Sequence, residues 1–260
     1  MMPILKVSGL NLSYYDKKVL DNVNLALNPG EIMTIIGPNG CGKSTFLSAT
    51  AGLCGKSADI TGKILVNNKN VTEYKRKELA RILSVLPQER NIPNISVRRL
   101  VEHGRFPHLD MSRHMSQKDQ TIVDSALELT NMQKFSCVNL VKLSGGERQR
   151  AYIAMTLAQD TPLMYMDEPA TYLDINYRYE VLDIIKMLNE TQGKTILMVL
   201  HDIDLALKYS HKIAVMDSGR IKLIATPQEV AASGIIDEIF GVKCIKLEID
   251  KNTEYIITRK

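Results

Sequence analysis

The segment that most constrains the fold of this chain is a glycine-rich run, Gly37-Pro38-Asn39-Gly40-Cys41-Gly42-Lys43-Ser44-Thr45. It follows the apolar, β-branched residues 32–36, which predict a buried strand, and it runs into residues 44–51, which predict a helix. A glycine-rich turn between a strand and a helix is typical of a phosphate-binding loop. The sequence therefore predicts an α/β unit that binds a nucleotide.

Each residue type in this loop suits phosphate. Gly37, Gly40 and Gly42 can adopt backbone angles that turn successive N–H groups inward around phosphate oxygens. The following helix adds its unpaired N–H donors and the positive end of its dipole. Lys43 would supply a charge to the β and γ phosphates, and the Ser44 hydroxyl would be a ligand of Mg²⁺.

Composition narrows the class of protein. The chain has 260 residues, 45% of them hydrophobic and 24% charged, which is enough for one large domain or a domain with a subdomain. Its longest apolar runs, such as residues 195–200, are much shorter than the roughly 20 residues that cross a bilayer. The first residues lack the pattern of a secretory signal, so we expect a protein that stays in the cytoplasm and does not span the membrane.

The cysteines, histidines and net charge do not indicate a metal centre or a nucleic-acid surface. The four cysteines have no CxxC spacing, so we expect reduced thiols rather than a zinc site or disulfides. Cys41 lies inside the glycine-rich loop and could be a redox sensor, but we favour a small residue that fills a tight loop. His103, His108 and His114 lack the spacing of a transition-metal site, and the net charge of +4 is only mildly basic.

The pattern of apolar residues divides the chain into a β layer, a core and a helical insertion. Residues 5–26 and 62–66 predict short antiparallel strands, and 73–82 predict a charged helix before a strand at 83–86. We assign approximately 1–95 and 160–260 to the β layer and core, and approximately 96–159 to a helical subdomain. The insertion contains predicted helices at 97–104, 117–130 and 147–159; the core then continues with strands at 163–166, 196–200 and 212–216 and a helix at 176–192. Such alternation builds a parallel sheet with right-handed crossovers.

Two carboxylates follow the predicted strand at 163–166. Asp167 and Glu168 would lie at the carboxyl edge of the sheet, where ligands of such folds bind. Adjacent strand residues point to opposite sides, so the two acids can have different roles. Asp167 would organise Mg²⁺ and Glu168 would polarise an attacking water. The alternative, a pair of solubilising acids, is less attractive beside a phosphate loop.

With these motifs in order, the chain resembles the ATP-binding subunit of an ABC transporter along essentially its whole length. Leu143-Ser144-Gly145-Gly146-Glu147 matches the signature motif of that family. Further matches are Gln88 to the Q-loop glutamine, His201 to the switch histidine, residues 170–174 with Asp174 to the D-loop, and Tyr14 to the aromatic residue that stacks on adenine, with Tyr15 as the alternative.

The resemblance implies a P-loop NTPase fold with a RecA-like core, an N-terminal antiparallel β layer and an inserted helical subdomain. It also implies a head-to-tail dimer that closes over two ATP molecules, with Mg²⁺ held by Ser44, Gln88 and Asp167. Ser144, Gly145, Gly146 and Glu147 of one copy would meet the nucleotide held by the loop of the other. Lys43, Glu168 and His201 would be the catalytic residues.

A finer resemblance indicates the cargo. Residues 104–108, 157–162, 172–175 and 200–202 look like the iron-siderophore, haem and cobalamin uptake branch, whose ATPases are prokaryotic importers. This implies a membrane permease as partner, an external binding protein acting indirectly, no nucleic acid, and a place on the cytoplasmic face of the membrane. Two departures, Glu147 for the commoner glutamine and Ala170 for threonine or serine, leave ATP hydrolysis expected.

Two alternatives stay open at this point. One is an ABC-type ATPase for another transported cargo, which shares every prediction for the ATP site. The other is a soluble ABC protein that acts on nucleic acid or ribosomes, although such proteins usually carry two nucleotide domains or long insertions. Residues 241–260 predict an additional strand pair with no assigned role.

Overall fold

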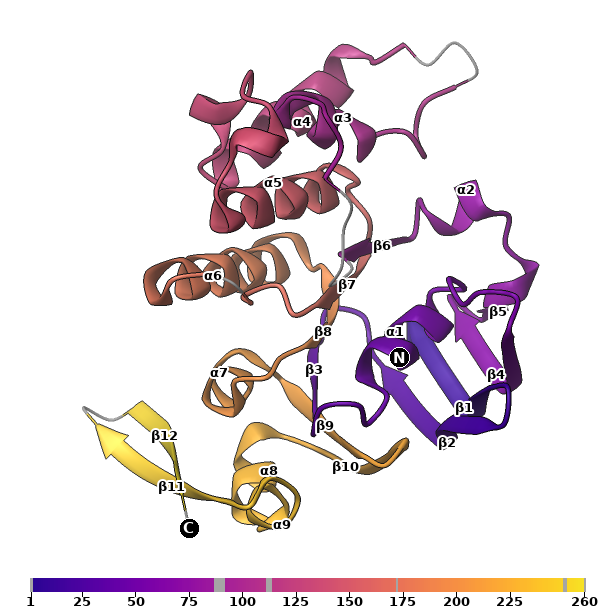
Figure 1. Ribbon diagram of the computed structural model, residues 1–260, viewed down its shortest axis with the longest axis vertical. Helices are drawn as coiled ribbons and strands as arrows, with labels where there is room; N and C mark the ends of the chain where they lie inside the picture. The colour runs from indigo at the N-terminus through magenta and orange to yellow at the C-terminus, as the bar shows by residue number, and fades with distance from the viewer. Residues whose placement is uncertain (1, 87–91, 111–113, 172, 250–251, 260) are drawn as a thin grey trace. The chain divides into compact units, whose positions relative to one another are not determined.

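The computed structural model describes residues 2–86, 92–110, 114–171, 173–249 and 252–259, and the elements are labelled in Figure 1. The chain forms two compact units, residues 1–73 with 195–260 and residues 74–194. Each unit is described by itself below. The second unit is one continuous segment of the sequence, and it separates the two segments that make up the first unit.

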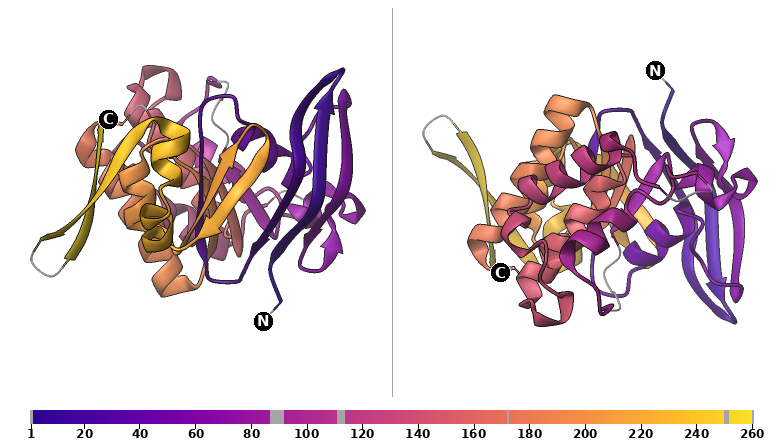
Figure 2. Two further views of the ribbon diagram at one scale, coloured as in Figure 1. Left: turned by 90° about the horizontal axis from the view of Figure 1, so that it is seen from below. Right: turned by 90° about the horizontal axis from the view of Figure 1, so that it is seen from above.

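The first unit begins with an antiparallel sheet in the order β2-β1-β4-β5, drawn in indigo and violet in Figures 1 and 2. The strands alternate buried and exposed residues, which is the pattern of a sheet with one face against a core. Its strands are β1 (Leu5–Tyr14), β2 (Lys17–Leu27), β4 (Ala58–Val66) and β5 (Lys69–Asn70). The predicted antiparallel β layer is confirmed, and β4 begins four residues earlier than predicted because it pairs with β1 up to Tyr14.

The same unit holds the strands that carry the phosphate loop. β3 (Ile32–Ile36) lies between β8 (Thr195–Val199) and β9 (Lys212–Asp217) and is parallel to both. Every residue of β3 and β8 is buried, as expected for parallel strands covered on both faces. The helix α1 (Lys43–Thr50) follows β3, and α7 (Ile203–Tyr209) follows β8.

The C-terminal part of the first unit extends beyond the predicted strands. β10 (Arg220–Ala225) pairs antiparallel with β9, and two short helices follow, α8 (Pro227–Ala232) and α9 (Ile235–Phe240). The hairpin of β11 (Val242–Ile249) and β12 (Asn252–Arg259) then confirms the strand pair predicted for 241–260. Contacts with α9 and α7 hold this hairpin to the rest of the unit (Figure 1).

The second unit contains a parallel strand pair and the predicted helices. β6 (Leu83–Leu86) pairs with β7 (Leu163–Asp167), and every residue of β7 is buried. The helices α3, α4 and α5 pack against one another, as Figures 1 and 2 show. The helices of this unit are α2 (Arg76–Leu79), α3 (Val97–His103), α4 (Gln117–Leu129), α5 (Gly145–Ala158) and α6 (Ile175–Gln192), with short 3-10 turns at Gln133–Phe135 and Leu140–Lys142.

The predicted charged helix at 73–82 is much shorter than expected. The structure has a 3-10 turn at Val71–Glu73 and then α2, which spans only four residues. None of the four is buried, so no apolar face packs this segment against the core, and charged residues alone do not hold a long helix. Within the described residues, no helix combines the length and apolar character that a membrane crossing requires.

Candidate active site

The glycine-rich loop connects β3 to α1 in the first unit, as predicted. A Cβ at Gly37 would lie 2.1 Å from the backbone oxygen of Met216, so only glycine fits where the loop leaves the sheet. Gly42 precedes α1 with φ of +109°, a backbone conformation that residues with a Cβ rarely adopt. Asn39 and Gly40 are exposed at the tip of the loop. Tight packing thus fixes the base of the loop, while its tip is open to a ligand.

The side chain of Lys43 folds back into this loop. Its Nζ donates to the carbonyl oxygens of Gly37 at 2.8 Å and Pro38 at 3.0 Å, and the residue is only 6% exposed. An ammonium group held inside a loop whose tip is rich in glycine provides a fixed positive charge for an anion. The Lys43 ammonium therefore lies inside the loop, and its role as the phosphate-binding cation stays a prediction.

Cys41 fills space at the base of the loop. It is 6% exposed, and its Sγ would be 2.8 Å from a Cβ at Gly37. Burial raises the pKa of the Cys41 thiol, against the opposing effect of the Lys43 charge. A buried thiol with a raised pKa forms little thiolate and reacts slowly. This favours the interpretation of Cys41 as a packing residue over a redox sensor.

His201 lies at the same sheet edge as the loop. β3 and β8 are adjacent and parallel, with Ile35 opposite Val199, and the loop and His201 each follow the carboxyl end of their strand. The N–H of Leu200 donates to the oxygen of Ile35 at 3.4 Å, which continues the pairing to the residue before His201. The His201 side chain is exposed. The first unit therefore presents the phosphate loop and the predicted switch histidine on one edge.

Tyr14 ends β1, where it pairs with Lys17 of β2 and Ala58 of β4. It is half-buried, and burial together with the neighbouring Cys54 side chain raises the pKa of its phenol. Tyr15, the alternative for stacking on adenine, is 89% exposed at φ of +51° in the turn that follows. Of the two rings, Tyr14 is the one whose position a strand pair holds on both sides.

The two predicted carboxylates end β7 in the second unit. Asp167 is the last residue of the strand, and both Asp167 and Glu168 are 6% exposed. Glu168 has φ of +53°, a conformation that is uncommon for a residue with a side chain and that is frequent at functional sites. The hydroxyl of Thr171 donates to Glu168 Oε2 at 3.1 Å. This bond holds the Glu168 carboxylate in one orientation.

The signature segment forms the start of α5 in the same unit. Ser144 is the N-cap, and its Oγ accepts from the N–H of Glu147 at 3.3 Å. Ser144 and Gly145 are exposed, so the start of the helix lies at the surface. A helix start at the surface suits a phosphate oxygen, which is the ligand predicted for Ser144, Gly145 and Gly146.

Contacts that the sequence did not reveal tie the signature helix to the segment after the carboxylates. Gln149 Nε2 donates to the Pro169 oxygen at 2.7 Å. A Cβ at Gly146 would lie 3.3 Å from Leu173 Cδ2, so the helix start and the predicted D-loop pack closely. Asp174, at the other end of that loop, is exposed and is the N-cap residue of α6. A lone glutamine two residues beyond the signature gave no signal for this role.

The residues present fit a nucleotide with Mg²⁺. The loop cradle has no room for a Cβ at Gly37, and its buried ammonium suits polyphosphate. Taken each by itself, the first unit offers the Ser44 hydroxyl and the second unit offers the Asp167 carboxylate, and both are oxygen ligands of the kind that Mg²⁺ prefers. The third predicted magnesium ligand, Gln88, lies outside the described residues.

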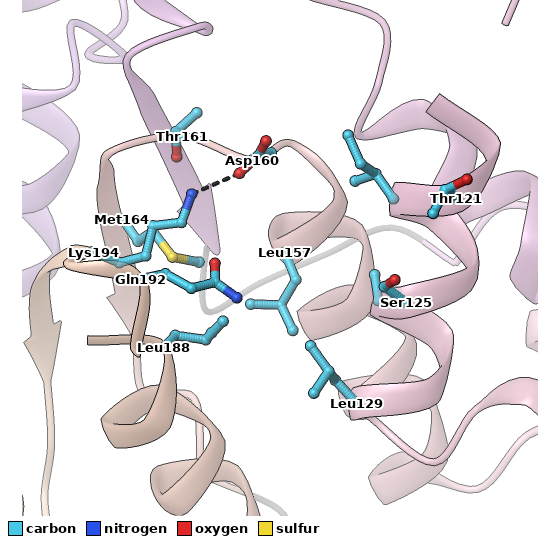
Figure 3. A pocket seen from close by; sticks show the side chains of 12 residues that line it. Thr121, Ser125, Leu129, Leu157, Asp160, Thr161, Met164, Leu188, Gln192 and Lys194 are labelled. Atoms are coloured by element: carbon cyan, nitrogen blue, oxygen red, sulfur yellow. Dashed lines mark hydrogen bonds and ion pairs between the residues drawn. The ribbon is translucent and has the colours of Figure 1, made fainter. Parts of the chain in front are cut away.

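A separate cavity of about 170 Å³ lies in the second unit among α4, the end of α5 and the end of α6 (Figure 3). Its walls include Leu129, Leu157 and Leu188, and Lys194 forms an ion pair of 2.6 Å with Asp160 at its edge. None of the predicted site residues that the structure describes lines it. The cavity is therefore not a part of the candidate nucleotide site.

Comparison with known families and relatives agrees with the motifs. The sequence pattern of the ABC transporter family matches residues 20–171. The petrobactin import ATP-binding protein FpuD of Bacillus anthracis is 41% identical over 245 residues, which cover 94% of this chain and 89% of that protein. The iron(3+)-hydroxamate import ATP-binding protein FhuC of Bacillus subtilis (strain 168) is 34% identical over 271 residues, which cover 99% of this chain and all of that protein.

Solved structures agree with the fold. The dimeric structure of a bacterial ABC transporter cassette matches with a TM-score of 0.76 at 26% identity, covering 86% of this chain and 98% of that chain. The predicted P-loop NTPase fold, with its antiparallel β layer and helical insertion, is therefore confirmed.

Proposed function

The chain belongs to the ABC transporter family, and from this premise we propose that it is an ATPase subunit that powers import of an iron complex through a separate membrane permease. The observation that carries the proposal is the similarity to iron-complex import ATP-binding proteins over 94% and 99% of the chain. A siderophore is the cargo that these relatives favour; haem and cobalamin are the other cargoes of the same branch.

The first unit holds the phosphates in this mechanism. The backbone N–H groups of the loop between Gly37 and Ser44 surround the β and γ phosphates, together with the start of α1. The Lys43 ammonium donates to phosphate oxygens instead of the loop carbonyls, so charged acceptors replace neutral ones. Pro38, Asn39 and Thr45 complete the loop around the nucleotide, and Tyr14 stacks on the adenine.

Hydrolysis depends on residues that follow two strands, Glu168 after β7 and His201 after β8. Glu168 orients the attacking water and draws off its proton, with its carboxylate held by Thr171. His201 contacts the γ phosphate. Ser44, Asp167 and Gln88 would hold Mg²⁺, which supplies positive charge to the phosphate oxygens when it is bound.

We further propose that two copies share each ATP, head to tail. Ser144, Gly145 and Gly146 of one copy donate to the γ phosphate on the loop of the other, and Asp174 meets the same interface. The dimeric cassette structure with the same fold supports this arrangement. Hydrolysis removes the group that both copies bind, so the dimer opens again and drives the transport step.

The partners follow from the transport role. The chain itself would bind the permease at the cytoplasmic face of a prokaryotic membrane, and an extracytoplasmic binding protein would deliver the cargo to that permease. Phe106, with 48% of its surface exposed after α3, lies in the segment 88–108 that we assign to the permease contact. No nucleic-acid partner is part of this proposal.

The test is uptake in cells that lack the native gene. Wild-type protein should restore uptake of an iron-loaded siderophore, and Glu168→Gln should not, because it loses the carboxylate that activates water. Glu190→Gln is the matched control, since this exposed glutamate of α6 has no predicted role. Restoration by Glu168→Gln would contradict the proposed ATPase role. Haem and cobalamin uptake, measured in parallel, separates a different cargo from a failed mechanism.

A further inference from the structure

Glu147 holds both polar groups of the signature serine. The backbone N–H and the Oγ–H of Ser144 each donate to Glu147 Oε2 at 2.8 Å. The N–H of Glu147 donates back to Ser144 Oγ, which completes a capping box. The Ser144 hydroxyl, which the proposed mechanism requires to donate to phosphate, therefore already donates to Glu147.

The carboxylate of Glu147 is charged and is not neutralised by an ion pair. Hydrogen bonds from the Ser144 backbone and side chain lower the pKa of Glu147, and the charges of Arg150 and Lys134 act in the same direction. Within the described part of the chain, no cation lies in ion-pair contact with this carboxylate. Arg150 instead stacks over the Tyr177 ring at 4.1 Å, and Lys134 lies over Phe135 at 5.1 Å.

We propose that Glu147 is a positioning residue that weakens ATP-driven dimer closure, because it competes with the γ phosphate for the Ser144 hydroxyl and repels that phosphate. This inference rests on the proposed function, in which Ser144 meets the nucleotide of the other copy. Closure requires the Ser144 hydroxyl to break its hydrogen bond to the Glu147 carboxylate and donate to the γ phosphate instead. It also brings the negative carboxylate close to the negative phosphate. Glu147 thus acts through Ser144 and keeps the closed dimer short-lived.

Glutamine at this position separates the two effects of Glu147. Its side-chain oxygen can still accept from Ser144, so the helix cap is kept, but the negative charge is lost. Removing one repulsive charge should tighten the ATP-bound dimer by about tenfold or more. Glu147→Ala removes both the charge and the cap, so it should also tighten the dimer while it lowers thermal stability.

The experiment measures the dimer dissociation constant with ATP in the Glu168→Gln background, in which hydrolysis is blocked. Glu147→Gln is added to this background and compared with Glu229→Gln as the matched control. Glu229 forms the same capping box with Thr226 in α8, with side-chain and backbone bonds of 2.9 Å. We expect tighter dimers for Glu147→Gln and no change for Glu229→Gln.

The outcomes distinguish this inference from the proposed function. If Glu168→Gln dimerises with ATP and adding Glu147→Gln leaves the dimer affinity equal or lower, the proposed role of Glu147 is wrong but the shared site stands. A dimer that forms only when Glu147→Gln is present supports both. If neither variant dimerises with ATP, both the inference and the shared-site mechanism are wrong. A purely structural role would make dimer affinity follow thermal stability, so Glu147→Ala would then weaken the dimer.

Discussion

The packing at Gly37 makes a quantitative prediction. In Gly37→Ala the new Cβ would lie 2.1 Å from the backbone oxygen of Met216 and 3.1 Å from its carbonyl carbon, so the loop or β9 must move. Overpacking of this kind costs about 1–3 kcal/mol. At about 2–4 °C per kcal/mol for a chain of this size, a cost near 2 kcal/mol lowers Tm by about 4–8 °C. The displaced loop should also lose at least one hydrogen bond to phosphate, which is about a tenfold loss of ATP affinity.

The assay is thermal unfolding together with ATP titration. Gly55→Ala is the matched control, because its φ is not positive and a Cβ there would have no atom within 4 Å. This control should keep the Tm and ATP affinity of the wild type. If Gly37→Ala also keeps both, the close approach of the loop base to β9 does not exist in solution and the reasoning fails.

Three further predictions concern the nucleotide, the dimer and the helical insertion. Lys43→Ala should weaken ATP binding by about 10- to 100-fold in equilibrium titration, and unchanged binding would refute the loop assignment. Ser144→Arg should abolish ATP-dependent dimers in sedimentation velocity while each monomer still binds ATP; dimers that persist would show that the signature is not shared. Asp119→Asn should destabilise the fold by about 3 kcal/mol in urea unfolding, because Arg105, whose Nε lies 2.8 Å from the carboxylate, would keep a buried charge. Burial opposes ionisation of Asp119, but hydrogen bonds from Ser116 and Arg105 lower its pKa. The ionised carboxylate therefore contributes its full stability above about pH 4, and the difference in unfolding free energy between wild type and Asp119→Asn should shrink as the pH falls further. A difference that stays constant with pH would contradict this.

The sequence predicted best where a local pattern decides the structure. The loop from Gly37 to Ser44 was found because strand, glycines and helix follow one another within a few residues. The runs predicted as strands at 163–166 and 196–200 consist of Leu, Ile, Met, Val and one Tyr, and they lie mainly within β7 and β8, so their identity did not depend on distant contacts. The strand pair predicted for residues 241–260 is present as β11 and β12.

The rest depends on contacts between segments that lie far apart in the chain. The helix predicted at 73–82 is only the four-residue α2 in the structure, because no apolar face packs it against the core. The short helices α7, α8 and α9 were not predicted, since six or seven residues give little periodicity.

The candidate site divides in the same way. Motif spacing indicated Asp167, Glu168 and Ser144 as candidates, but it did not indicate the hydrogen bonds that Glu168 and Ser144 form. Three tertiary features have no signature in the sequence: the positive φ of Glu168, the hydrogen bond that Glu168 accepts from Thr171, and the hydrogen bond from Gln149 to the Pro169 oxygen. Likewise, the capping bonds of Glu147 follow from its spacing to Ser144, but their consequence for phosphate becomes visible only with the geometry.

The most direct test of the proposed mechanism is the mass of Glu168→Gln with and without ATP, measured by size-exclusion chromatography with light scattering. The variant keeps the size of the side chain but loses the carboxylate, so it should bind ATP without turning it over. We predict a monomer without nucleotide and a dimer with ATP, which reverts when ATP is removed. A protein that binds ATP and remains a monomer at saturating nucleotide would contradict the shared site.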